Sequence, residues 1–164
     1  MQGSSKLFQL SPAALQPLIT YFDKADTLLW NLDVDSYNEK NIKALLKSYS
    51  EIEAILTEIL SDSKEVKHPS VTLITKIMLG VFGNIPAFDR YFTTTFHSMY
   101  GGFLSCQRHE LDCILDFYTN NKAVIDSLSK EMYVIDFNGM ATSRTYKKVK
   151  LIDMYGFTKA ATLQ

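Results

Sequence analysis

The sequence predicts a mainly α-helical protein, a single compact domain over residues 1–164 with six or seven helices around a buried helix at 71–82. Apolar residues recur with the helical period in several segments, and breaks containing Gly, Pro or Asn separate these segments. In addition, 46% of the residues are hydrophobic and 12% are aromatic. This is enough apolar mass for a core without disulfides or metal ions.

The N-terminal part carries two amphipathic segments. Residues 11–29 place apolar side chains near one helical face, and Pro17 must either kink this helix or mark its start. A polar bridge at 31–38 leads into the clearest amphipathic helix of the chain, with apolar positions Ile42, Leu45, Leu46, Tyr49, Ile52, Leu56 and Ile59. Because its other face is charged, we expect this helix to pack on the domain by one stripe.

The segment 71–82 differs from the others, because apolar residues cover nearly its whole circumference. A helix that is apolar on all sides is buried, so we place this one at the centre of the domain. Gly83 and Asn84 end it, and Pro86 can open the next short helix. The buried side of that next helix is expected to consist of Phe88, Tyr91, Phe92 and Phe96.

The C-terminal part is predicted to hold two helical patterns between 105 and 132, with a break at Asn120-Asn121. Residues 133–137 followed by Asn138-Gly139 are typical of a strand and a tight turn, so a small β-hairpin fits near 133–143. A short helix resumes at 148–155.

The balance of charge excludes a strongly cationic nucleic-acid binder, since 17 Lys and Arg stand against 18 Asp and Glu. The average hides a gradient: residues 1–60 hold five basic and eight acidic side chains, whereas residues 131–164 hold five basic and three acidic. We therefore expect an anion-binding face near the C-terminus, with phosphate contacts from Arg144, Lys147, Lys148 and Lys150. The alternative is that these four side chains form an ordinary solvated face.

Membrane and targeting signals do not stand out in the sequence. The longest nearly uncharged stretch, 71–88, is interrupted by Gly80, Gly83 and Pro86 and is too short to span a bilayer. Residues 1–11 contain no apolar core of signal-peptide length. We therefore expect a cytoplasmic protein with no membrane partner, in which Cys106 and Cys113 are free thiols.

A metal site and a thiol nucleophile are two interpretations of one pattern. Cys106, His109 and Cys113 form C-x2-H-x3-C after His97, which could place soft ligands along one side of a helix. Cys and His on the inward face of an apolar helix are more often core residues, so we expect no metal and no cofactor. A Cys–His pair would need a lowered thiol pKa and an open cleft. The phosphate-loop, dinucleotide-binding, zincin and esterase motifs do not occur.

Residues 75–92, TKIMLGVFGNIPAFDRYF, combine an apolar helix, a glycine-containing break, an apolar-Pro-apolar step and an Asp. This stretch resembles the second hairpin helix and following turn of helix-hairpin-helix DNA glycosylases, in which an Asp lies at the lesion pocket. The resemblance implies that Asp89 occupies the catalytic Asp position. The chain departs from that family in lacking the hairpin glycines, in placing Lys76 away from the nucleophilic Lys, and in having Arg90 instead of Thr or Ser.

The same stretch, together with KLIDMY at 150–155, is also similar to an uncharacterised family of bacterial and mobile-element proteins with IPAFDRYF-like and KLIDMYFW-like segments. Gly156 stands where that family has an aromatic residue, so the C-terminal helix is expected to end early or to differ there. A purely structural alternative for Asp89 is that it caps a helix or pairs with Arg90 or Lys76, while the aromatic residues form the core.

Two functions are consistent with these observations. The first is a non-catalytic or weakly catalytic helical module that acts on nucleic acid or nucleoprotein in a bacterial defence or phage context, supported by the basic C-terminal cluster. The second is a protein-binding inhibitor encoded by a mobile element, of the anti-CRISPR kind, with no nucleic-acid contact. The near-neutral net charge and the acidic residues 1–60 favour the second, and salt-dependent retention on DNA or RNA separates the two.

Overall fold

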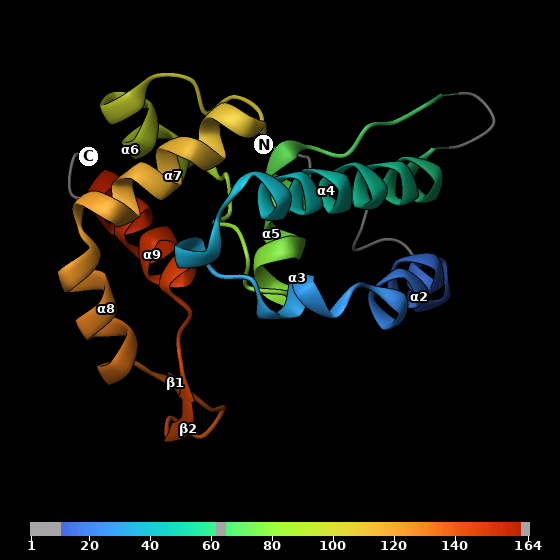
Figure 1. The fold of residues 1–164 in the computed structure, drawn as a ribbon. Helices are drawn as coiled ribbons and strands as arrows, with labels where there is room; N and C mark the ends of the chain where they lie inside the picture. Colours follow the sequence, from blue (N-terminus) through green and yellow to red (C-terminus); the bar gives the residue numbers. More distant parts are fainter. Residues whose placement is uncertain (1–10, 62–64, 162–164) are drawn as a thin grey trace.

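The computed structural model of the protein describes residues 11–61 and 65–161. This part of the chain is mainly helical, with eight α-helices and one two-stranded antiparallel hairpin (Figure 1). The predicted fold class is therefore confirmed, with more helices than the six or seven expected. No helix within these residues is long and apolar enough to cross a membrane.

The additional helix arises because segment 11–29 does not form one continuous rod. A 3-10 turn, Pro12–Leu15, leads into α2 (Gln16–Lys24), and α3 (Thr27–Asn31) follows after a break. Pro17 stands in the first turn of α2, so it marks a helix start, where its missing N–H costs no hydrogen bond. The carboxylate of Asp26 accepts a hydrogen bond from Leu28 N at 2.8 Å and starts α3.

The long amphipathic helix is confirmed as α4 (Glu39–Leu60), which begins where the Asn38 side chain accepts a hydrogen bond from Asn41 N. A second 3-10 turn, Val34–Ser36, precedes it. One stripe of α4 is buried, and it consists of Ile42, Leu45, Ser48, Ile52 and Leu56. The spacing of its apolar residues therefore predicted the buried face of the helix correctly.

The expected central helix is α5 (Val71–Val81), which lies in the middle of the molecule beside α4 (Figure 1). The expectation of burial on all sides is wrong, because only Ile74, Thr75 and Met78 are fully buried along it. Lys76 and Gly80 are exposed. The outer face of α5 forms one wall of an open groove, so its apolar residues there are only partly covered.

Helices α6 (Arg90–Tyr100) and α9 (Lys148–Ala161) form the closest helix pair of the core. The ring of Phe92 stacks on Phe96, with ring centroids 4.3 Å apart, and on Phe88 at 5.5 Å. Gly156 of α9 lies directly against Phe92, and its carbonyl accepts a hydrogen bond from Thr95 Oγ1 at 2.8 Å. The expected early end of this helix at Gly156 is therefore wrong: the glycine is what allows α9 to approach α6.

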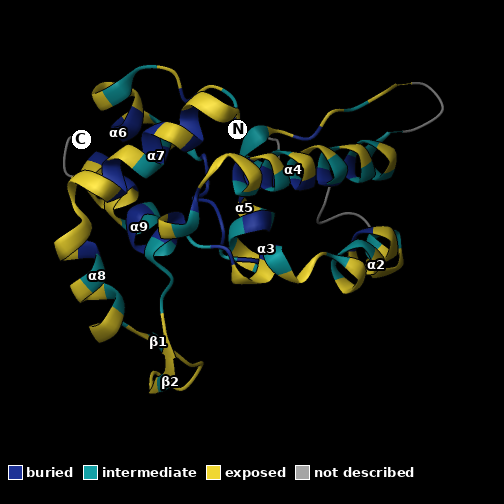
Figure 2. Ribbon diagram, in the orientation of Figure 1, coloured by how far each residue is buried: buried dark blue, intermediate teal, exposed yellow. Residues whose placement is uncertain are grey.

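The remaining elements complete one end of the molecule. Helices α7 (Arg108–Asn120) and α8 (Lys122–Glu131) are followed by the expected hairpin, formed by β1 (Tyr133–Ile135) and β2 (Ala141–Thr145). The hairpin projects away from the helices, and its residues are mostly exposed (Figures 1 and 2). Tyr133 pairs with Thr145 and Ile135 with Ala141, so β2 contains a bulge.

Candidate functional site

A groove between α5 and α9 brings together charged residues that lie far apart in the sequence. One hollow of about 540 Å³ is lined by Leu79, Ala87, Met154, Phe157, Thr158 and four charged residues, Lys76, Asp89, Lys150 and Asp153. A second hollow of about 420 Å³ shares Lys76, Leu79 and Lys150 with the first and reaches Val134 and Thr145 at the base of the hairpin. We call the two together the α5–α9 groove. Its volume is in the range of a ligand site.

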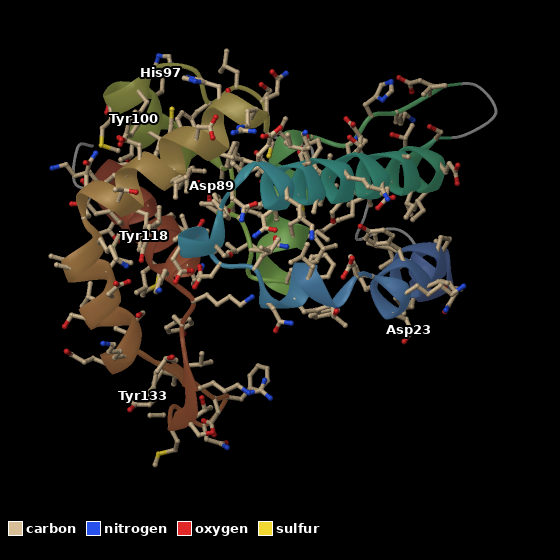
Figure 3. All side chains as sticks on the ribbon, in the orientation of Figure 1. Asp23, Asp89, His97, Tyr100, Tyr118 and Tyr133 are labelled. Atoms are coloured by element: carbon tan, nitrogen blue, oxygen red, sulfur yellow. The ribbon has the colours of Figure 1, made fainter. Side chains whose placement is uncertain are left out.

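Asp89, labelled in Figure 3, stands at the N-terminus of α6. Its Oδ1 accepts hydrogen bonds from Tyr91 N at 3.0 Å and Phe92 N at 3.1 Å, so the carboxylate caps the helix. Its Oδ2 lies 3.9 Å from Lys76 Nζ, on the side of the groove. The structure thus supplies the capping and pairing roles that were the structural alternative for this residue.

Asp153 plays a similar part on the opposite wall. Its Oδ1 accepts a hydrogen bond from Ala87 N at 2.9 Å, and its Oδ2 accepts one from Lys150 Nζ at 2.7 Å. Both groove carboxylates are therefore held by backbone N–H groups. The ammonium groups are less engaged: the Lys76 side chain is 57% exposed and that of Lys150 is 36% exposed. The two ammonium groups therefore keep donors for a ligand, and Asp89 Oδ2, 3.9 Å from Lys76 Nζ, is a carboxylate oxygen beside them.

The predicted cluster of four basic residues is divided by the fold. Arg144 lies in β2 and is exposed, with no side-chain partner in the described ranges, whereas Lys148 and Lys150 lie in α9. Lys148 points to Asp35 and Asp126 and lies 5.6 Å from the centre of the Tyr118 ring. Burial lowers the pKa of Lys148, but the hydrogen bond and charge of Asp35 outweigh it and leave this pKa above its ordinary value.

The side chain of Lys147 connects three segments of the chain through hydrogen bonds. Its Nζ donates hydrogen bonds to the carbonyl oxygens of Trp30 at 2.7 Å, Leu32 at 3.0 Å and Phe82 at 2.8 Å. These carbonyls come from the ends of α3 and α5, where helices leave acceptors without partners. Burial lowers the pKa of Lys147, and the charge of Asp33 partly offsets this. Lys147 and Lys150 both line the groove, but the ammonium group of Lys147 is bound to these three carbonyls.

We expect Lys147→Met to lower the free energy of unfolding by about 3 kcal/mol, because it leaves three carbonyl oxygens without their charged donor. Lys150→Met, three residues further along in α9, is the matched control, and its partly exposed ion pair with Asp153 should contribute no more than about 1 kcal/mol. Urea unfolding followed by circular dichroism measures both. Equal losses in the two variants would contradict the structural role of Lys147.

The C-x2-H-x3-C pattern is not assembled into a metal centre. Cys106 and Cys113 are free and buried, and burial, with a smaller contribution from Glu110, raises the pKa of Cys106 to about 12. Cys113 Sγ lies 3.7 Å from His109 Nε2, whereas His97 Nδ1 lies 2.9 Å from the Gly102 carbonyl oxygen. Within residues 11–61 and 65–161, no three His, Cys, Asp or Glu side chains are placed to share an ion.

Four residues of the groove were not predicted as site residues: Lys76, Asp153, Met154 and Phe157. A signal for three of them was present, because 150, 153, 154 and 157 share one face of a helix. Nothing in the sequence indicates that this face lies opposite Lys76 across a groove.

Comparisons of the chain with models of protein families, with curated proteins and with solved structures found no match. The resemblances to helix-hairpin-helix DNA glycosylases and to the mobile-element family therefore stay predictions. The function has to follow from the chemistry of the groove.

Proposed function

We propose that the protein is a non-catalytic nucleic-acid-binding module that holds a single strand in the α5–α9 groove. The observation that supports this most is the pair of Lys76 and Lys150, two ammonium groups from α5 and α9 in a groove that also holds two carboxylates and apolar side chains such as Leu79, Met154 and Phe157. A phosphate needs cationic donors but no special spacing, and the apolar walls suit the bases.

The charges of the groove favour an anion even though the numbers of Lys and Asp are equal. Asp89 and Asp153 each use one oxygen on backbone N–H groups, which partly neutralises their charge locally. The ammonium group of Lys76 is 3.9 Å from its nearest carboxylate oxygen, and each ammonium group has three donors. Each lysine can therefore bind the oxygen of a separate phosphate without displacing a cap.

An exposed aromatic ring favours a single strand over a duplex. Phe157 is 49% exposed at the rim of the groove, and its ring contacts Tyr91 edge to face with centroids 4.8 Å apart. The guanidinium carbon of Arg90 lies 5.9 Å from the centre of the Tyr91 ring and adds a cation there. Bases can stack on such a ring only when they are unpaired, because a duplex presents its phosphates outward.

The role of Asp89 in this proposal is to hold the start of α6. Asp89→Asn keeps a side-chain oxygen that can accept from the same backbone N–H groups, so we expect nucleic-acid binding to persist. A glycosylase-like reaction would instead lose turnover in this variant while binding remained. Release of a base from a damaged oligonucleotide by the parent protein would contradict the absence of catalysis.

The test is the binding of fluorescent single-stranded DNA and RNA by anisotropy at two salt concentrations. Lys76→Ala combined with Lys150→Ala should weaken binding at least tenfold and reduce the salt slope by about 1.4, or about 0.7 for each phosphate contact on a single strand. The matched control is Lys43→Ala with Lys47→Ala on α4, whose side chains are 72% and 77% exposed. That pair carries the same change of charge away from the groove.

Two outcomes overturn the proposal. One is an equal loss of affinity in the α4 control, which would show that binding depends on the net charge of the chain and not on the groove. The other is a parent protein without salt-dependent binding to single-stranded or double-stranded DNA or RNA. In that event the protein-binding inhibitor becomes the better account of the chain.

A further inference from the structure

The projecting hairpin has two outer edges, one on β1 and one on β2, and their backbones differ in regularity. β1 and β2 pair only with each other in the part of the chain that the structure describes. Along β2 the ladder is bulged, and Arg144 N donates to Thr142 Oγ1 at 3.2 Å, so that strand satisfies part of its own backbone. β1 contains no bulge, no proline and no charged residue, and these are the devices that usually block an edge strand.

The hydrogen bonds of the hairpin show which backbone groups of β1 are free. Tyr146 N donates to the Met132 carbonyl oxygen, and Asp136 N donates to the Met140 carbonyl oxygen. Even-numbered residues of this segment therefore point their backbone groups toward β2. The N–H and C=O groups of Tyr133 and Ile135 point outward, on the free edge.

We propose that a second copy of this chain pairs with the β1 edge, so that two hairpins form one four-stranded antiparallel sheet about a two-fold axis at Val134. In this register Tyr133 of each copy lies opposite Ile135 of the other, and all four outward N–H groups find acceptors. A register centred on Tyr133 or on Ile135 would pair part of β1 with residues outside the strand, in α8 or in the turn, so fewer of the four N–H groups would find acceptors. An isolated two-stranded hairpin is marginal in water, which gives the pairing a driving force.

The side chains and charges of β1 are self-complementary in this register. Tyr133 and Ile135 are 45% and 51% exposed on one face of the strand, and each aromatic ring would meet a β-branched side chain across the axis. Tyr133 lies far from Asp89 (Figure 3). Asp136 would lie opposite Met132, and its Oδ1 already accepts from Asn138 N and Met140 N at 2.9 Å. Like charges therefore do not face each other.

The dimer is measured by sedimentation velocity of the full chain over a roughly hundredfold concentration range, where we expect a dissociation constant in the micromolar range. Ile135→Lys places a charge on the edge and should weaken dimerisation at least tenfold. Val66→Lys is the control, because Val66 is 67% exposed outside the hairpin, in the segment before α5. Thermal melting confirms that both variants fold.

A cysteine pair tests the register. In the proposed sheet the two Val134 residues form a non-hydrogen-bonded pair with Cα atoms about 4.5 Å apart, within disulfide range. Val134→Cys should therefore form a covalent dimer under mild oxidation, whereas Met140→Cys in the exposed turn should not. A parent protein that stays monomeric over the whole range, or equal cross-linking of both cysteine variants, would overturn the proposal. Neither result depends on nucleic-acid binding.

Discussion

Met78→Asp is expected to abolish cooperative folding. Met78 has no exposed surface and lies in the main hydrophobic core on the inner face of α5. An unpaired carboxylate there loses its hydration and also leaves a cavity, at a combined expense of about 4 kcal/mol or more. Because small domains are stable by only about 5–15 kcal/mol, a loss of this size removes a large part of the stability. Far-ultraviolet circular dichroism during thermal melting measures the effect.

Ile77→Asp tests whether the loss of stability depends on how deeply the substituted side chain is buried. Ile77 is adjacent in sequence but only partly buried, so its charged variant should melt at a lower temperature than the parent while still folding cooperatively. Met78→Leu conserves volume and should lose less than about 1.5 kcal/mol. Melting of Met78→Asp within a degree or two of the parent would show that α5 is not the centre of the core.

Gly156→Ala is expected to destabilise the protein by about 3 kcal/mol, although alanine is normally the better helix former. A Cβ atom at this position would lie 2.5 Å from Phe92 Cδ2 and 3.2 Å from its Cε2. The Phe92 ring is 1% exposed and stacks between Phe88 and Phe96, so it has no room to rotate away. The helices α6 and α9 would have to separate, which would also strain the hydrogen bond from Thr95.

The matched control for this prediction is Gly80→Ala. Gly80 also lies inside a helix, but a Cβ atom there would have nothing within 4 Å. That variant should gain up to about 1 kcal/mol from helix propensity alone. Chemical denaturation compares the two variants directly. A gain of stability in both would contradict the close approach of α9 to Phe92.

Local pattern was sufficient for much of the fold. The helix α4 follows from its apolar stripe and its Asn38 cap, and the hairpin follows from Asn138-Gly139. These features depend on neighbours a few residues apart, which sequence periodicity describes well. The burial of α5 was overestimated because an apolar surface indicates a preference for contact, and only the packing of α9 decides how much of that surface is covered.

The sequence predicted some residues of the groove but not that they lie together. The sequence pointed to Asp89 for its place in a motif and to Lys150 for its place in a basic segment, but it could not bring them to one groove with Lys76. It also grouped Lys147 and Lys148 with Lys150 on charge alone. In the structure Lys147 binds carbonyls more than 60 residues away in sequence, and Lys148 pairs with Asp35.

The amino-acid sequence by itself determined the helical class, the amphipathic α4 and the turn of the hairpin, because helix period, caps and turn residues act over short distances. Only the tertiary structure decided which lysines remain available, why Gly156 continues a helix, and which strand edge stays open. These properties depend on contacts between residues distant in the chain. Neither composition nor periodicity carries information about those contacts, since both describe each segment alone.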